Sequence, residues 1–204
     1  MSNSDYLMLT PAGVFEAFLR ANPTPQQLSL QDILSEKVTM RVGQWLTKHS
    51  HEWLDEFTEQ GLIERLPQKL VASNMALDEF LPYVVASLSG SRKAAIASNE
   101  GFCLAKIGYT QEEADRLSVA GADFFDFFVR QEQRGLAITG KAVSLFRQVD
   151  LLMPETSFVF LWIDGTGYVL ILDSEPLTNN RAFVELIWAI KTSGLKFHHD
   201  EQEV

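Results

Sequence analysis

The stretch AAIASNEGFCLAKIGYTQEEADRLSVAGADFF, residues 94–125, decides the fold of this chain. Residues 94–98 and 102–107 are two short apolar runs, and the Asn-Glu-Gly segment between them has the composition of a hairpin turn. Polar residues and a helical spacing of apolar residues follow from residue 110 onward. The stretch therefore predicts two antiparallel strands followed by a helix.

The start of this helix carries a capping-box pattern. The Thr110 hydroxyl and the Glu113 carboxylate are spaced to bind backbone N–H groups that the first helical turn leaves unpaired. The apolar positions that follow keep helical spacing: Ala114, Leu117, Gly121, Phe124, Phe125 and Phe128. We expect Leu117 and Phe124 to face the sheet.

Helical periodicity also precedes the hairpin and ends the chain. Apolar residues from Leu77 to Leu88 share one helix face, and Pro82 predicts either a kink there or a later start. Three further strands are predicted by runs rich in Val, Ile, Phe, Tyr and Trp, at residues 142–149, 157–163 and 168–172. A final helix is expected to begin after Thr178 or Asn179 and to end at Gly194.

The order from residue 76 to 197 is thus helix, two strands, helix, three strands, helix. It predicts an α+β domain with a central antiparallel five-stranded sheet. In order and in the motifs of residues 94–125, this region resembles the Roadblock (dynein light chain, MglB-like) family, with Asn99-Glu100-Gly101 where many members have Asp-Gly. The resemblance implies a homodimer that pairs through its second helix and third strand. It also implies a role in regulating or scaffolding small Ras-like GTPases.

The N-terminal part has a different pattern. Helices, one of them at Ser50 to Gln60, precede two short strands expected at residues 62–66 and 69–72, and this order resembles a winged-helix domain. We expect a winged-helix-like helical module at residues 1–73, a Roadblock-like domain at 74–197 and an acidic flexible tail at 198–204.

Charge limits the kinds of partner that suit this chain. The 204 residues carry a net charge of −10, and both parts of the chain have more acids than bases. Nucleic acid and anionic membrane surfaces are therefore poor expected partners. The helix at residues 50–60 carries no Arg or Lys. Its acids suit a basic patch on another protein, and we name them as candidate interaction residues: Glu52, Asp55, Glu56 and Glu59.

Phe127 is the fifth candidate interaction residue. Four phenylalanines between residues 124 and 128 occupy more than one helix face, so we expect another subunit to cover Phe127. The alternative function is a transcriptional regulator that uses the winged helix and dimerises through its C-terminal domain. An enzyme or small-ligand sensor is the third class, and the sequence contains no Walker loop, G-x-S-x-G or H-E-x-x-H motif to support it.

Cofactors and metals are not expected. The lone Cys103 lies among apolar residues in a predicted strand, and the four histidines have no metal-ligand spacing, so we assign no catalytic, cofactor or metal residue. No apolar run approaches the ~18 residues of a membrane span, and the N-terminus lacks a signal-peptide pattern. The sequence predicts a non-enzymatic cytoplasmic adaptor.

Overall fold

The computed structural model describes residues 5–34, 37–70, 77–136, 142–149 and 151–199. The chain divides into two compact units. The first holds Met1–Phe18, Asn22–Leu77 and Asn179–Val204, and the second holds Leu19–Ala21 and Asp78–Thr178. The domain boundaries expected from the sequence, after residues 73 and 197, remain a prediction.

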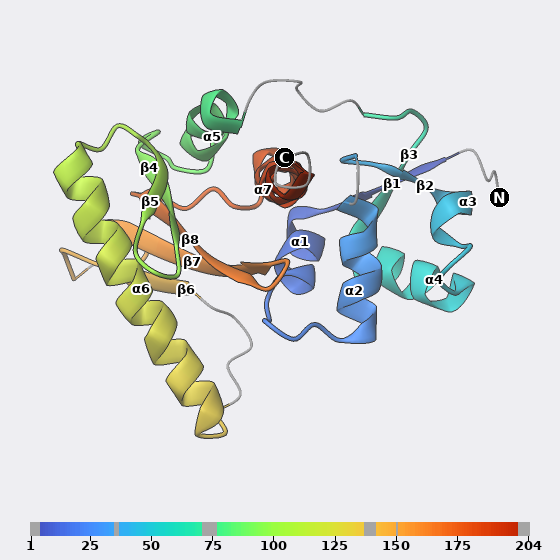
Figure 1. Ribbon diagram of the computed structural model, residues 1–204, viewed down its shortest axis with the longest axis horizontal. Helices are drawn as coiled ribbons and strands as arrows, with labels where there is room; N and C mark the ends of the chain where they lie inside the picture. The colour runs from blue at the N-terminus through green and yellow to red at the C-terminus, as the bar shows by residue number, and fades with distance from the viewer. Residues whose placement is uncertain (1–4, 35–36, 71–76, 137–141, 150, 200–204) are drawn as a thin grey trace. The chain divides into compact units, whose positions relative to one another are not determined.

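The first unit combines several short helices and the longer α7 with a small sheet (Figure 1). Its elements are β1 (Tyr6–Leu9), α1 (Pro11–Ala17), α2 (Pro25–Gln31), a 3₁₀ turn (Asp32–Leu34), β2 (Met40–Arg41), α3 (Val42–Trp45), α4 (His51–Glu59), β3 (Ile63–Leu66) and α7 (Arg181–His199). The strand order is β2-β1-β3, and both pairings are antiparallel. The central strand therefore comes from the first residues of the chain.

The expected strand hairpin after α4 is partly wrong. The first strand is present as β3, but it pairs with β1, from Tyr6 opposite Leu66 to Leu9 opposite Ile63. Lys69 has no strand structure, and residues 71–72 lie outside the described part of the chain. The N-terminal strand takes this position because Leu7 and Leu9 are fully buried there. A strand in a solvent-exposed wing would bury less apolar surface.

The second unit has the predicted five-stranded antiparallel sheet (Figure 1). Its elements are α5 (Leu77–Ala86), β4 (Ala94–Ser98), β5 (Cys103–Ile107), α6 (Gln111–Gln133), β6 (Ala142–Leu145), β7 (Thr156–Ile163) and β8 (Thr166–Asp173). The strand order is β5-β4-β8-β7-β6. The α+β class and the order of elements are confirmed, and α5 continues through Pro82.

A two-residue turn joins β7 to β8. Ile163 pairs with Thr166, and the residues between them, Asp164 and Gly165, have φ values of 48° and 80°. Two consecutive left-handed residues are the signature of a type I′ hairpin turn, whose twist matches that of the strands. The sequence Asp164-Gly165-Thr166-Gly167 between the last two predicted strands is typical of a tight hairpin, and the structure confirms that prediction.

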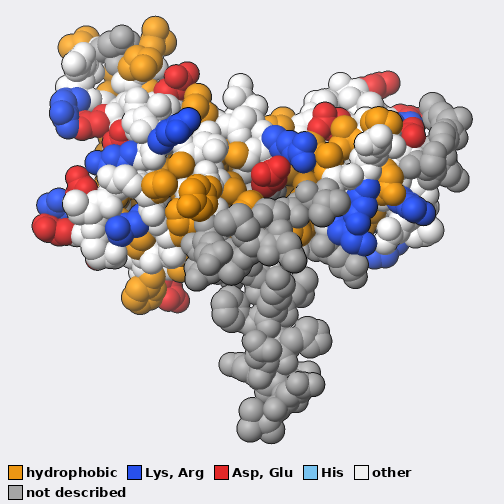
Figure 2. Space-filling view, turned by 90° about the horizontal axis from the view of Figure 1, so that it is seen from above, with side chains coloured by type: hydrophobic (Ala, Val, Ile, Leu, Met, Phe, Trp, Pro, Cys, Tyr) orange, Lys and Arg blue, Asp and Glu red, His pale blue; other side chains and the backbone are white. Residues whose placement is uncertain are grey.

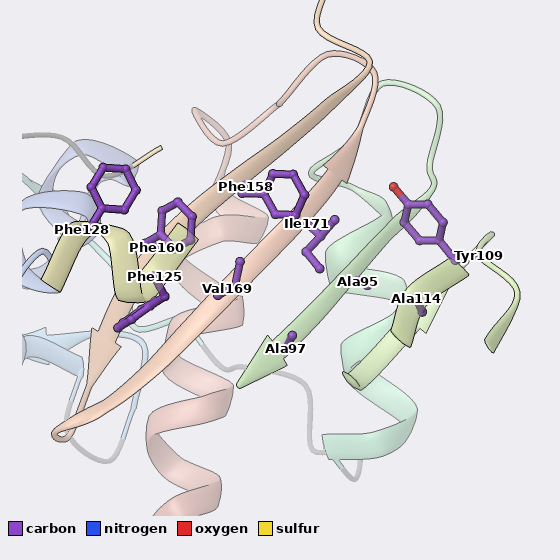
Figure 3. Packing of buried hydrophobic residues seen from close by; sticks show 10 residues of the cluster. All are labelled: Ala95, Ala97, Tyr109, Ala114, Phe125, Phe128, Phe158, Phe160, Val169 and Ile171. Carbon is purple, nitrogen blue, oxygen red and sulfur yellow. The ribbon is translucent and has the colours of Figure 1, made fainter. Parts of the chain in front are cut away.

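Helix α6 packs on one face of this sheet (Figure 3). Its buried positions follow one line along the helix: Ala114, Ser118, Gly121, Phe125 and Phe128. They meet Ala95 and Ala97 of β4 and the aromatic and branched residues of β7 and β8. The expected facing pair, Leu117 and Phe124, is only partly buried at the side of this line, so the central residue is Phe125.

Small residues let α6 approach the sheet closely. A Cβ atom added to Gly121 would lie 2.9 Å from Val169 Cγ1, and one added to Gly167 would lie 2.4 Å from the Phe125 ring. Real Cβ atoms do not come that close to their neighbours. The glycines therefore set the depth at which the Phe125 ring enters the core.

The last helix, α7, is longer than expected. It runs to His199 and passes the predicted end at Gly194. A glycine inside a helix costs only about 1 kcal/mol, and no proline follows it in the chain. Within the described residues, no helix is long and apolar enough to cross a membrane.

Candidate protein-interaction surface

The start of α6 is fixed by polar contacts. Thr110 Oγ1 accepts a hydrogen bond from the Glu113 amide at 3.2 Å, and Glu113 Oε2 accepts one from the Thr110 amide at 2.8 Å. The bond from the Thr110 amide, a second bond that the Thr110 hydroxyl donates to Glu113 Oε2 at 3.0 Å, and the Lys93 ammonium 3.4 Å from Glu113 Oε1 hold the pKa of the Glu113 carboxyl below its usual value. The predicted capping box is confirmed, and it orients the helix that carries the aromatic residues.

Two ionisable side chains near this helix are kept in their neutral forms. Burial raises the pKa of the Tyr109 phenol, and the Lys93 ammonium lies 4.4 Å from the centroid of its ring. Burial also raises the pKa of the Cys103 thiol, which is half-buried in β5. A raised thiol pKa disfavours the nucleophilic thiolate, which agrees with a structural Cys103.

Pairs of aromatic side chains pack α6 against β7. Phe124 lies 5.2 Å from Phe158 and Phe128 lies 5.0 Å from Phe160, both measured between ring centroids in edge-to-face geometry. Phe127 contacts Phe128 at 5.8 Å but remains 46% exposed. The helix thus presents a half-exposed aromatic ring beside its buried line.

Strand β6 is the last strand of the sheet on the side toward which these rings lie. Val143 pairs with Phe158 and packs against the same cluster, so its side chain is on the α6 face of the sheet. In the described part of the chain, β6 has a neighbour on one side only, which is β7. An edge strand of this kind can pair with another strand.

The direction of the backbone hydrogen bonds in the sheet shows which N–H and C=O groups of β6 do not point toward β7. The Asp173 amide donates to the Lys93 carbonyl at 3.0 Å, so odd-numbered residues of β8 bond to β4. In an antiparallel sheet, the backbone groups of successive residues in a strand point alternately to its two neighbouring strands. With the registers of the two pairs, odd-numbered residues of β7 therefore bond to β8, and even-numbered residues of β7 bond to the odd-numbered residues of β6. The backbone N–H and C=O groups of Ala142 and Ser144 therefore point away from β7.

The loop after β6 is strongly apolar. Residues 142–149 were expected to form one strand, but the strand ends at Leu145. Phe146 and Val149, which were expected in the strand, are 37% and 97% exposed. The apolar side chains that follow are also exposed: Leu151 68%, Leu152 87% and Met153 56%. A hollow of about 310 Å³ lies in the same loop, lined by Arg147, Gln148, Met153 and Glu155.

The sequence did not identify this loop as a surface. Its composition is as apolar as that of a strand, and Pro154 is the only local sign that strand pairing stops.

On the face drawn in Figure 2, acidic and basic side chains are interspersed, and hydrophobic side chains come to the surface between them.

The four predicted acids lie together on α4, in the first unit. Glu52, Asp55 and Glu59 are exposed, and Glu56 is half-buried. Asp55 Oδ1 is 3.7 Å from an Arg65 nitrogen. Glu56 accepts hydrogen bonds from two amides, Gln26 at 3.4 Å and Gln60 at 3.1 Å. Two of the four acids thus have partners within their own unit, and Phe127 belongs to the other unit.

His49, in the first unit, has structural contacts. His49 Nε2 lies 3.0 Å from Asp32 Oδ2, and its ring lies 4.6 Å from Trp45. Among the described residues, no group of three or more His, Cys, Asp or Glu side chains is arranged to hold a metal ion.

Comparison with solved structures found similarity to a Roadblock/LC7 domain from Streptomyces avermitilis, with 14% identity and a TM-score of 0.40. That match covers 61% of this chain and 98% of the other. Myxococcus xanthus MglB is 12% identical with a TM-score of 0.36, and the match covers 63% of this chain and 96% of that one. A scan of protein-family models and a search of curated proteins gave no match.

Proposed function

We propose that this chain is a non-enzymatic, dimeric adaptor in the cytoplasm that regulates or assembles a complex of a small Ras-like GTPase. The observation that carries the proposal is the α6–β6 surface. There, an edge strand with outward backbone groups packs through Val143 against the cluster under α6, the helix that carries the half-exposed Phe127. Such a surface is suited to a second copy of the same chain, because an antiparallel pair of identical edge strands satisfies two-fold symmetry. The GTPase is inferred from the sequence resemblance.

The first unit would add a second partner surface in this proposal. Its helix α4 presents Glu52 and Glu59 to solvent, with Asp55 and Glu56 between them. A row of carboxylates on one helix face attracts a basic patch and repels a phosphate backbone. We therefore keep a winged-helix-like module that contacts protein as part of the proposal.

The homodimer is tested by substitutions at Ser144. Ser144→Pro removes an outward N–H while leaving the bonds from β6 to β7 in place, so light scattering at micromolar concentration should report the mass of one chain. The unsubstituted protein should report twice that mass. Ser144→Ala is the matched control, because it loses the hydroxyl that lies 2.8 Å from Ser157 Oγ and keeps the N–H. If Ser144→Pro remains a dimer, the interface is elsewhere.

The GTPase role is tested by binding. Ras-like GTPases of the same organism are loaded with GDP or with a non-hydrolysable GTP analogue, and their affinity for the dimer is measured by calorimetry. We expect a difference of at least about tenfold between the two nucleotide states, which corresponds to ~1.4 kcal/mol. Equal affinity in both states would leave a nucleotide-blind scaffold, and absence of binding would remove the GTPase from the proposal.

A further inference from the structure

The loop between β6 and β7 has fixed ends and an exposed middle. The Glu155 amide donates to the Leu145 carbonyl at 2.8 Å, and the Arg147 guanidinium pairs with the Glu155 carboxylate. Between these contacts, Val149 is 97% exposed and Leu151 is 68% exposed. Several large apolar side chains exposed in one short loop are a sign of an interaction surface.

We infer that this loop is an arm that covers the C-terminal half of α6, at Phe127, in a second copy of the chain. The inference rests on the proposed dimer and adds a contact to it. The arm consists of the apolar side chains between the two fixed ends: Phe146, Val149, Leu151, Leu152 and Met153.

The position of the arm along β6 supports this occupant. The loop leaves β6 at its last residue, Leu145. In an antiparallel pair, the end of one β6 lies beside the start of the other. The arm of one copy is therefore brought to the start of the strand in the second copy.

Phe127 lies near that start. Phe128 packs on Phe160, and Phe160 is one residue past Val159, which pairs with the first residue of β6, Ala142. Phe127 is in contact with Phe128. The exposed ring of α6 thus stands at the end of β6 that the arm of a second copy would reach, and the arrangement repeats by symmetry.

Charge also favours a second copy at this place. Two chains of net charge −10 repel each other over most of their surfaces. In the loop, the Arg147 and Glu155 charges neutralise each other, Gln148 is uncharged, and Asp150 is the one further charged residue in the sequence between them. The large exposed side chains described there are apolar. The loop is a place where two copies can approach with little electrostatic cost.

The contact is tested by a disulfide between copies. Two variants are made in a Cys103→Ala background, one with Val149→Cys and one with Phe127→Cys, and they are refolded together and oxidised. We expect a covalent dimer from the mixture and little from either variant alone. Leu28→Cys, at an exposed apolar position of the first unit, replaces Val149→Cys as the control and should give no cross-link.

Association is measured in parallel. Val149→Asp is expected to raise the dimer dissociation constant at least about 100-fold, because each symmetric dimer loses two buried apolar contacts and gains two desolvated charges. Leu28→Asp should leave it unchanged.

A stable dimer without the cross-link, or with an unchanged dissociation constant for Val149→Asp, overturns the arm and leaves the proposed dimer standing. A chain that stays monomeric overturns both. If that monomer sediments with phosphatidylcholine vesicles and Val149→Asp does not, lipid and not a second copy covers the loop.

Discussion

Replacing Phe125 with alanine is expected to lower the free energy of unfolding by about 3 to 5 kcal/mol. Phe125 is 3% exposed, and its ring lies 5.8 Å from Phe160 and 4.8 Å from Trp162. The backbone of Gly167 also presses against this ring, so few atoms can move to fill the space that alanine leaves. Denaturation by guanidinium, followed by circular dichroism, measures the loss.

Phe127→Ala is the matched control for this prediction, since Phe127 is 46% exposed on the same helix. Its loss should be below about 1.5 kcal/mol, because much of the ring already contacts water. Both substitutions are made in the Ser144→Pro background, so that dimerisation contributes to neither value. Equal losses at the two positions would mean that the helix does not present Phe125 to the sheet.

Gly13→Ala is expected to destabilise the first unit by about 3 kcal/mol, although alanine is normally the better helix former by ~1 kcal/mol. The added Cβ would lie 1.9 Å from the Leu62 carbonyl oxygen and 2.8 Å from the Leu62 carbonyl carbon. Both are backbone atoms, so α1 must shift. A shift strains the bond from the Thr10 amide to that oxygen, 3.0 Å, and the bond from Thr10 Oγ1 to the Gly61 carbonyl, 2.6 Å.

The comparison variant is Gly61→Ala. Gly61 has a φ of 68° and open space around the missing Cβ, so its cost comes from backbone strain alone, about 1 to 2 kcal/mol. Thermal unfolding is followed by tryptophan fluorescence in a Trp162→Phe background, in which all remaining tryptophans, the buried Trp45 among them, belong to the first unit. A Gly13→Ala protein as stable as the parent would show that α1 does not pack against this turn.

The second unit could be predicted because its signals are local. The capping box at Thr110 and Glu113 and the Asp164-Gly165 turn each act within four residues, and the structure contains both. The prediction of which α6 side chains face the sheet was less accurate. Phe124 and Phe125 are neighbours and both apolar, and only the close contacts at Gly121 and Gly167 decide between them. Sequence periodicity does not contain that information.

Pairing between distant segments could not be predicted. Strand β1 pairs with β3 more than fifty residues later, and no local pattern distinguishes this partner from the hairpin expected after Leu66. The exposed loop after β6 was missed for another reason. Hydrophobic residues at a protein surface have the same composition as those of a buried strand, so only the exposed fraction of Val149 and its neighbours separates them.

The division of the chain has a consequence for its synthesis on the ribosome. The first unit is built from both ends of the chain, with α1 in contact with α7, whereas the second unit is almost continuous from Asp78 to Thr178. During translation, the second unit can complete its sheet while the first still lacks its last helix. Premature termination after residue 178 would therefore release a chain that has every residue of the second unit but lacks α7 of the first, a product for quality-control proteases.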